Sequence, residues 1–141
     1  MQIREFMAED YPTVRTLWER TGMLKAGPTD ELPALEACAA RNPGLFLVGV
    51  DPKSGVIATA LAGFDGRRAY LYHVAVDPDY RRRGYARMLL EEIMPQIWTL
   101  GPDKIVLRVA RENAGAITLY RSLGMSSNEA VIAMTIERPM R

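Results

Sequence analysis

The stretch from residue 69 to residue 110 constrains the fold of this 141-residue chain more than any other part of the sequence. In residues 69–76, alternate side chains would point to opposite faces of a strand, and both faces include apolar residues. This indicates a strand inside a sheet. Apolar residues recur at helical spacing from Tyr85 to about Leu100, and residues 104–110 again have the pattern of a strand. A strand, a helix and a second strand in this order predict two parallel strands joined by a right-handed crossover.

The segments on either side of this β-α-β unit predict further elements. Strands are expected at residues 3–7, 45–50, 56–64 and 131–136. Helices are expected after Asp10, which can cap the first of them, from about residue 30 to 41, and from Asn113 to Leu123. A break at Ala26-Gly27-Pro28-Thr29 separates the first two helices. The sequence therefore predicts a single domain over residues 1–141 of the α/β class, with a mixed, mostly antiparallel sheet, a central parallel β-α-β unit and helices on both faces.

Charge and cysteine content exclude several classes of protein. The chain has 18 Lys and Arg against 17 Asp and Glu, so its net charge of +1 provides no general attraction to nucleic acid or to an anionic membrane. The single cysteine, Cys38, excludes an internal disulfide and a cysteine-based metal cage, and no metal is expected. No run approaches the roughly 20 apolar residues of a membrane span, and the N-terminus lacks the pattern of a secretory signal. A cytoplasmic protein is expected.

The turn between the strand at 69–76 and its helix has the composition of an anion site. Gly84 and Ala86 fall where the helix begins, so the backbone can be approached closely at N–H groups that the helix leaves unpaired. Four arginines that can grip phosphate surround this point: Arg81, Arg82, Arg83 and Arg87. The glycine spacing of dinucleotide folds and the Gly-Lys-Ser/Thr signature of nucleotide-triphosphate loops are both absent. On charge alone, the same arginines could form a solvated surface or, together with Tyr80 and Tyr85, a contact with nucleic acid.

Two strings of this sequence resemble the signatures of a known family. His73-Val74-Ala75-Val76-Asp77-Pro78 followed by Arg81-x-x-Gly84-x-Ala86 is similar to the acetyl-coenzyme A motif of the GCN5-related N-acetyltransferases, the GNAT superfamily. Downstream, Asn113-x-x-Ala116-x-x-Leu119-Tyr120-x-x-x-Gly124 is similar to the second signature of that family. The resemblance covers essentially the whole chain, and shorter pieces resemble the small bacterial subgroup typified by the acetyltransferase YpeA.

This resemblance implies a GNAT fold, acetyl-CoA as co-substrate and an N-acetyltransferase activity without a metal. The central parallel strands would splay apart, and the backbone of Val74, Ala75 and Val76 would pair with the pantetheine arm. Backbone N–H groups of residues 82–87, with Gly84 at their centre, would hold the pyrophosphate. Asn113 would bind the pantetheine or cap its own helix, and Tyr120 would serve as catalytic acid toward the coenzyme sulfur. The implied coenzyme-binding set is Val74, Ala75, Val76, Arg81, Arg82, Arg83, Gly84, Tyr85, Ala86, Arg87 and Asn113.

The acceptor side of the reaction is less constrained by the sequence. A small-molecule or peptide amine is the expected partner, in a pocket built from the first two helices and the turn at 65–68; nucleic acid and membrane are not expected, and a homodimer is left open. In the family that this sequence resembles, members that acetylate protein N-termini often carry a glutamate on the fifth strand; the matching position here is Arg108, so that base does not transfer. His73, which is better explained as a packed or hydrogen-bonded structural residue, and Glu112, a surface residue at a helix start, are the other candidates, and the base stays unassigned. A non-catalytic acyl-CoA-binding module of the same fold is the alternative reading.

Overall fold

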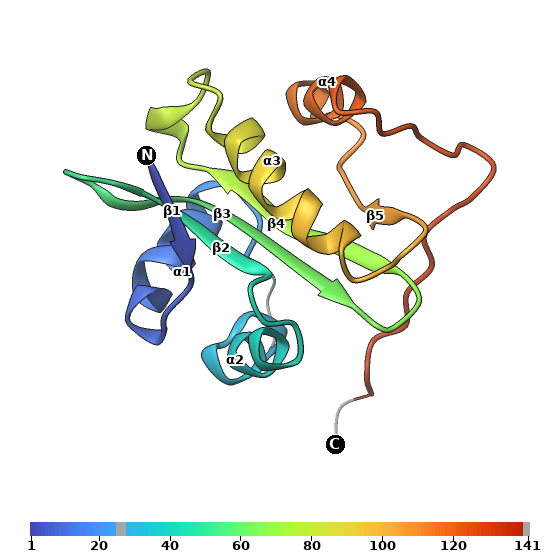
Figure 1. Ribbon diagram of the computed structural model, residues 1–141, viewed down its shortest axis with the longest axis horizontal. Coiled ribbons are helices and arrows are strands. Elements are labelled where there is room, and N and C mark those ends of the chain that lie inside the picture. The colour runs from blue at the N-terminus through green and yellow to red at the C-terminus, as the bar shows by residue number, and fades with distance from the viewer. Residues whose placement is uncertain (25–27, 140–141) are drawn as a thin grey trace. The chain divides into compact units, whose positions relative to one another are not determined.

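A computed structural model describes residues 1–24 and 28–139, and its central feature is a five-stranded mixed sheet. The strands follow one another across the sheet in chain order: β1 (Gln2–Glu5), β2 (Phe46–Asp51), β3 (Gly55–Phe64), β4 (Ala69–Val76) and β5 (Ile105–Leu107). Neighbouring strands are antiparallel except β4 and β5, which are parallel. The predicted mixed α/β fold with a central β-α-β unit is therefore confirmed (Figure 1).

The chain divides into two compact units, residues 1–108 and residues 109–141. In its described residues, the first unit contains the sheet and the α-helices α1 (Tyr11–Arg20), α2 (Leu32–Arg41) and α3 (Tyr85–Trp98). It also contains three short 3-10 helices: η1 (Ala8–Asp10), η2 (Pro28–Asp30) and η3 (Pro78–Tyr80). The predicted break between the first two helices coincides at Pro28 and Thr29 with η2, while its first two residues lie outside the described part of the chain. The second unit, described as far as residue 139, contains the helix α4 (Ala114–Ser122).

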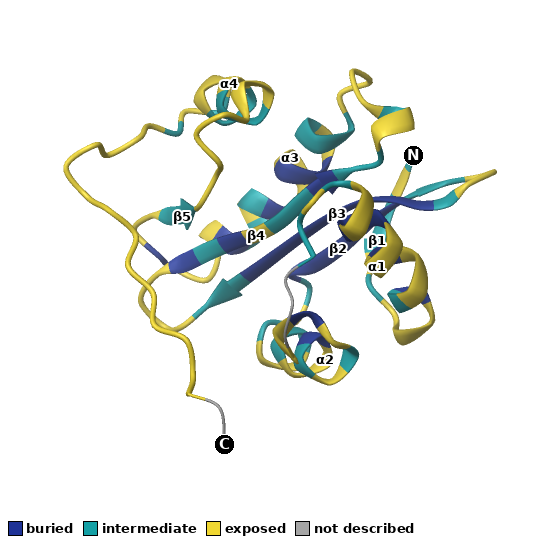
Figure 2. Cartoon of the chain, turned by 180° about the vertical axis from the view of Figure 1, so that it is seen from behind, coloured by how far each residue is buried: buried dark blue, intermediate teal, exposed yellow. Residues whose placement is uncertain are grey.

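Helices cover both faces of the sheet in the first unit. In Figure 1, α3 crosses in front of the strands, and the opposite view shows α1 and α2 on the other face (Figure 2). The face of α3 that meets the sheet is fully buried: Leu89, Leu90, Ile93 and Ile97. On the opposite face, the indole of Trp18 is completely buried in a cluster with Leu35 and Phe46. The residues coloured as buried in Figure 2 run along β2, β3 and β4. The sheet therefore lies between two hydrophobic cores, one on each of its faces.

Two predicted strands differ from the structure. The strand expected over 104–110 is formed only at Ile105–Leu107. The last strand, expected over 131–136, is wrong, because these described residues have no regular secondary structure and their side chains are exposed, Ile132 to 77% and Ile136 to 95%. Alternating apolar residues form a strand only where a neighbouring strand accepts their backbone groups, and the described part of the second unit contains none.

Asp10 occupies the predicted N-cap position of α1, but its side chain makes no capping hydrogen bond to that helix because it bonds elsewhere. Its carboxylate accepts two hydrogen bonds of 2.8 Å from the Arg4 guanidinium and one of 2.8 Å from the backbone N–H of Met7. Bonding from Arg4 comes first among the causes that hold the pKa of Asp10 below its ordinary value. Since the folded-state pKa lies below the unfolded one, the stabilisation is complete above the unfolded pKa and is lost as the pH falls through the folded pKa.

Asp10→Asn is expected to lower the free energy of unfolding by about 2–3 kcal/mol near pH 7, because hydrogen bonds from a cation to a buried carboxylate are lost. The deficit relative to the unmodified chain should shrink as the pH falls below about 4, where the carboxylate also becomes protonated. Urea unfolding at both pH values measures this difference. Asp103→Asn, at an exposed aspartate, is the control. A deficit that stays the same in acid would contradict the assigned pKa direction.

A buried hydroxyl joins α1 to β3 and β4. Thr59 is fully buried, and its Oγ1 accepts a hydrogen bond of 3.0 Å from Trp18 Nε1 and donates one of 2.7 Å to the carbonyl oxygen of His73. Thr59→Val, which keeps the shape but removes the hydroxyl, is expected to cost about 1–3 kcal/mol, because the indole N–H is left buried without a partner. Denaturant unfolding measures it against Thr16→Val, whose exposed hydroxyl bonds the carbonyl of Pro12. Equal losses in the two variants would contradict this role.

Candidate functional site: an open strand edge and an N–H-rich turn

The parallel strands β4 and β5 pair over only three residues each. Ala69, Tyr70 and Leu71 pair with residues 105–107, and from Tyr72 to Val76 the described residues give β4 no partner on that side. On its other side, Ala75 pairs with Thr59 of β3, and the N–H of Asp77 donates to Ile57 at 2.8 Å. Backbone groups alternate in direction along a strand, so those of Val74 and Val76 point to the open edge. The end of β4 thus presents free hydrogen-bonding groups to a ligand.

The chain leaves this open edge through a turn that is fixed by side chains. Asp77 Oδ1 accepts a hydrogen bond of 2.9 Å from the backbone N–H of Asp79 and so caps η3. Arg20 of α1 forms ion pairs with both carboxylates, reaching Asp79 Oδ2 at 3.4 Å. The start of the predicted anion site is therefore tied to the body of the first unit.

Residues 82–84 then take a conformation with two left-handed positions. Arg82 has φ +65° and Gly84 has φ +77°, and in the described part of the chain the backbone N–H groups of Arg82, Arg83 and Gly84 make no hydrogen bond. Left-handed residues spaced in this way turn successive N–H groups toward one side, where an anion can bind. A Cβ built on Gly84 would meet no atom within 4 Å, so the space above this residue is open.

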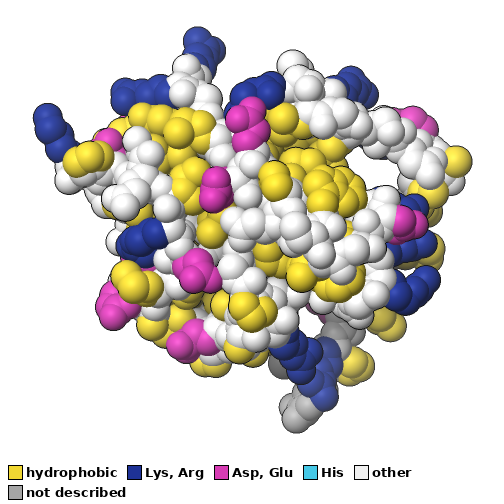
Figure 3. Space-filling view, viewed as in Figure 1, with side chains coloured by type: hydrophobic (Ala, Val, Ile, Leu, Met, Phe, Trp, Pro, Cys, Tyr) yellow, Lys and Arg dark blue, Asp and Glu magenta, His cyan; other side chains and the backbone are white. Residues whose placement is uncertain are grey.

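Helix α3 starts directly after Gly84, with Tyr85, Ala86 and Arg87 in its first turn. The unpaired N–H groups of the turn and the positive end of the helix therefore coincide. Arg81, Arg82 and Arg83 are exposed, while Arg87 pairs with Glu91 at 3.6 Å. In the space-filling view, Lys and Arg side chains gather at the upper edge, over the loop that leads into α3 in Figure 1 (Figure 3). The turn has the backbone and the charge that a pyrophosphate group requires.

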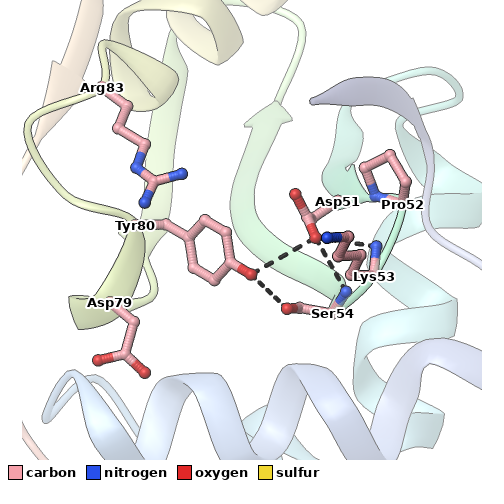
Figure 4. Close-up of a pocket in the computed structure, with 7 residues that line it drawn as sticks. All are labelled: Asp51, Pro52, Lys53, Ser54, Asp79, Tyr80 and Arg83. Carbon is pink, nitrogen blue, oxygen red and sulfur yellow. Dashed lines mark hydrogen bonds between the residues drawn. The ribbon is translucent and has the colours of Figure 1, made fainter.

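The ring of Tyr80 anchors this turn to the β2–β3 hairpin. Its hydroxyl hydrogen-bonds the hydroxyl of Ser54 and reaches Asp51 Oδ2 at 3.4 Å (Figure 4). The guanidinium of Arg83 lies over the ring, 5.0 Å from its centroid. These residues line an open cavity of about 510 Å³ together with Pro52, Lys53 and Asp79. The sequence indicated for Tyr80 only a possible contact with bases, whereas in the structure its hydroxyl and ring bond the turn to the β2–β3 hairpin and to Arg83.

A second cavity, of about 550 Å³, lies between α2 and the strands β3 and β4. It is lined by Ala34, Ala37, Cys38, Arg41, Asn42, Gly63, Phe64, Asp65, Tyr70 and Tyr72. Asp65 accepts hydrogen bonds of 2.8 and 2.7 Å from the backbone N–H groups of Arg68 and Arg67, and these bonds lower the pKa of its carboxyl group. The carboxylate at this cavity is therefore ionised at neutral pH. The helix α2 and the turn at 65–68 are two of the parts predicted to build an acceptor pocket.

The second unit carries the other two predicted site residues on α4. Asn113 is the N-cap of that helix, and its Oδ1 accepts a hydrogen bond of 3.2 Å from the backbone N–H of Ala116. Tyr120 lies two turns further along, and burial raises the pKa of its phenol above the ordinary value. The hydroxyl of Tyr120 is therefore protonated at neutral pH and able to donate a hydrogen bond.

One partner of a predicted candidate was missed by the sequence analysis. His73 Nε2 lies 2.9 Å from Asp30 Oδ1, and Asp30 comes from η2, 43 residues earlier in the chain. Because the two residues lie on different elements and are far apart in the chain, no spacing pattern in the sequence indicates that they pair. In the described residues there is no group of three or more His, Cys, Asp or Glu side chains that could hold a metal ion. The described helices are also too short or too polar to cross a membrane.

Comparisons with known proteins agree on the family. The sequence model described as "Acetyltransferase (GNAT) family" matches residues 2–125. The chain is 33% identical over 134 residues to acetyltransferase SG1711 from Sodalis glossinidius, covering 95% of this chain and 93% of that relative. The ribosomal-protein-S18-alanine N-acetyltransferase from Escherichia coli has a TM-score of 0.62 at 28% identity, covering 87% of this chain and 76% of that one.

Rv2747 from Mycobacterium tuberculosis, solved in complex with CoA, has a TM-score of 0.71 at 16% identity and covers 92% of this chain and 74% of that one. This last likeness concerns the fold alone. The open edge of β4 and the turn into α3 occur within a family match that spans residues 2–125, and a 33% identical acetyltransferase aligns with 95% of the sequence. This chain belongs to the GNAT family of acetyltransferases.

Proposed function

We propose that this chain transfers the acetyl group of acetyl-CoA directly to an amine, with the coenzyme lying along the open edge of β4 and on the turn into α3. One observation carries the proposal. The free backbone groups of Val74 and Val76 are followed, within one short turn, by the unpaired N–H groups of Arg82, Arg83 and Gly84. A ligand with an amide-containing arm can pair with the strand edge, and a pyrophosphate attached to that arm can bind the N–H groups of the turn. Coenzyme A has both parts.

Each part of the coenzyme has a proposed partner. The pantetheine arm adds to the sheet as an extra strand through Val74 and Val76, while Ala75 keeps its pairing with β3. The pyrophosphate binds the N–H groups from Arg82 to Arg87, and the exposed Arg81 and its neighbours supply mobile positive charge. Asn113, whose Oδ1 accepts one hydrogen bond from its own helix, donates from its amide nitrogen to the pantetheine.

The amine is proposed to bind in the cavity beside α2. The ionised Asp65 attracts an ammonium group, and Tyr70 and Tyr72, whose ring centroids are 6.3 Å apart, offer aromatic faces to it. A small-molecule amine and the N-terminus of a peptide both satisfy this chemistry. Arg41 at the same cavity favours an acceptor that also carries a negative or hydrogen-bond-accepting group.

The reaction needs no covalent enzyme intermediate. The neutral amine attacks the thioester carbonyl carbon, and the backbone N–H of Val74, at the end of the open edge away from the turn, donates to the oxygen on which negative charge develops. The C–S bond breaks with its electron pair on sulfur, and the phenol of Tyr120, a role carried over from the family, donates to that thiolate. Free tyrosine has a pKa of about 10 and a thiol about 8.5, so hydrogen bonding to sulfur is favoured over complete proton transfer.

An assay of thiol release tests the proposed function. Acetyl-CoA is mixed with the protein and with an alanyl peptide, a polyamine or an aminoglycoside, and the amine is then analysed by mass spectrometry. Amine-dependent thiol release with one acetyl group added to the amine is expected. Acetyl-CoA binding without thiol release for every amine would favour a non-catalytic acyl-CoA-binding module instead.

A further inference from the structure

The imidazole of His73 is held by a carboxylate in a way that fixes its proton. The distance between His73 Nε2 and Asp30 Oδ1 is 2.9 Å, and the two side chains are 17% and 7% exposed. A carboxylate can only accept a hydrogen bond, so the neutral ring carries its proton on Nε2. The lone pair then lies on Nδ1, which has no hydrogen-bond partner among the described residues. Orientation of a histidine by a buried carboxylate is the arrangement that makes its other nitrogen a base.

The backbone of His73 is also held in an unusual conformation. Its φ is +45°, in the left-handed region that residues with a Cβ rarely adopt, and the register of β3 and β4 shifts beside it, between Thr59 and Leu61. The carbonyl oxygen accepts the hydrogen bond from buried Thr59, and the ring lies against Trp18 with centroids 4.2 Å apart. Such positions persist where the surroundings determine them, and a strand irregularity of this kind redirects a side chain.

His73 lies where the proposed reaction needs a general base, for which no residue has been assigned so far. His73 directly precedes Val74, the first residue whose backbone faces the open edge of β4, and Tyr72 on its other side lines the cavity beside α2. The ring therefore belongs to the segment that joins the proposed coenzyme edge to the proposed acceptor cavity. An acceptor ammonium must lose a proton before it can attack, since its pKa is near 10.

We propose that His73 is the general base of the reaction and that Asp30 is the residue that positions it; this inference rests on the proposed function. Nδ1 takes one proton from the bound ammonium, and the freed lone pair forms the C–N bond while the C–S bond breaks with its electrons on sulfur. The amide nitrogen loses its second proton as the thiolate gains one. The imidazolium returns its proton to solvent after the products leave.

Among the described residues, His73 is contacted from η2, α1 and β3. Asp30, from η2, is the one charged side chain among the described residues that bonds to the ring. Trp18 of α1, which lies against the ring, and Thr59 of β3, which donates to the His73 carbonyl oxygen, are uncharged at all relevant pH values. Because His73 is the single histidine of the chain, its nitrogen signals need no assignment by mutation. Nitrogen-15 NMR can thus read its tautomer and its titration directly.

The test combines that NMR measurement with acetyl transfer to the best amine of the panel above. We expect the neutral ring to carry its proton on Nε2 and the pH profile of kcat/KM to follow the titration of the ring. His73→Gln keeps an N–H for Asp30 but has no base, and should lower kcat by about 100-fold or more while acetyl-CoA affinity is unchanged. Asp30→Asn should alter the tautomer and move the pH profile.

Each other result overturns the inference in a recognisable way. If His73→Gln transfers acetyl groups as fast as the unmodified chain, or with the same pH profile, His73 is only a packing residue and the proposed function stands. A neutral ring that carries its proton on Nδ1 would also exclude it as the base. If the unmodified chain releases no thiol with any amine, the proposed function and the base fail together.

Discussion

Acetyl-CoA is expected to bind the Gly84→Val variant about tenfold more weakly, or worse, than the unmodified chain. A Cβ at residue 84 meets no atom within 4 Å, and we expect a side chain there to obstruct a phosphate that approaches the N–H groups of the turn. The loss of one hydrogen bond to a charged phosphate costs about 1.5–3 kcal/mol. The variant will also be less stable, because φ +77° in a residue with a Cβ costs roughly 1–2 kcal/mol. Isothermal titration calorimetry on folded protein separates the two effects.

Gly22→Val is the matched control for this experiment. Gly22 has φ +73°, and a Cβ built on it also meets nothing within 4 Å, but it follows α1 and is not part of the turn. The two variants should lose similar stability, whereas only Gly84→Val should lose affinity for the coenzyme. Unchanged affinity in a well-folded Gly84→Val variant would remove the turn from the binding site.

Turnover in the Tyr120→Phe variant is expected to fall by about 100-fold, the typical effect of removing one donor to developing charge. Burial raises the pKa of this phenol, so the unmodified chain keeps its donor over the whole neutral range. Since the hydroxyl is proposed to act on the departing sulfur and not on the bound coenzyme, the dissociation constant of acetyl-CoA should be nearly unchanged. Steady-state kinetics of thiol release and a separate binding titration measure the two quantities.

The division between kcat and affinity decides whether Tyr120 takes part in the chemistry. A loss confined to affinity would make it a binding residue of the coenzyme. Equal turnover in the two proteins would remove it from the mechanism, and the helix α4 would then contribute only structure to the second unit.

Local patterns allowed the sequence to predict the central unit of the fold. The strand at 69–76, the helix after Gly84 and the strand near 105 are each defined by the periodicity of their own residues, and the crossover rule then sets their parallel pairing. The turn could also be predicted, because small residues and arginines at a helix start are sufficient to indicate an anion site. Of the two left-handed residues in this turn, Gly84 could be expected from the sequence, whereas Arg82 could not.

Features that depend on distant partners could not be predicted. Residues 131–136 have the composition of a strand, but pairing decides whether a strand forms. Asp10 stands at the N-cap position of α1, yet its carboxylate accepts hydrogen bonds from Arg4 and from the backbone of Met7 instead of from the helix. The bond between His73 and Asp30 joins residues on different elements, so the sequence alone left His73 between a packing role and a catalytic one.

The central claim is that coenzyme A binds through the open edge of β4 and the turn into α3, and amide chemical shifts test it most directly. On titration of the nitrogen-15-labelled chain with coenzyme A, we expect the largest shift changes at the N–H groups of Val74, Val76 and residues 82–86. Binding that leaves these groups unchanged, with the largest changes instead in the hairpin around residues 51–54, would contradict it.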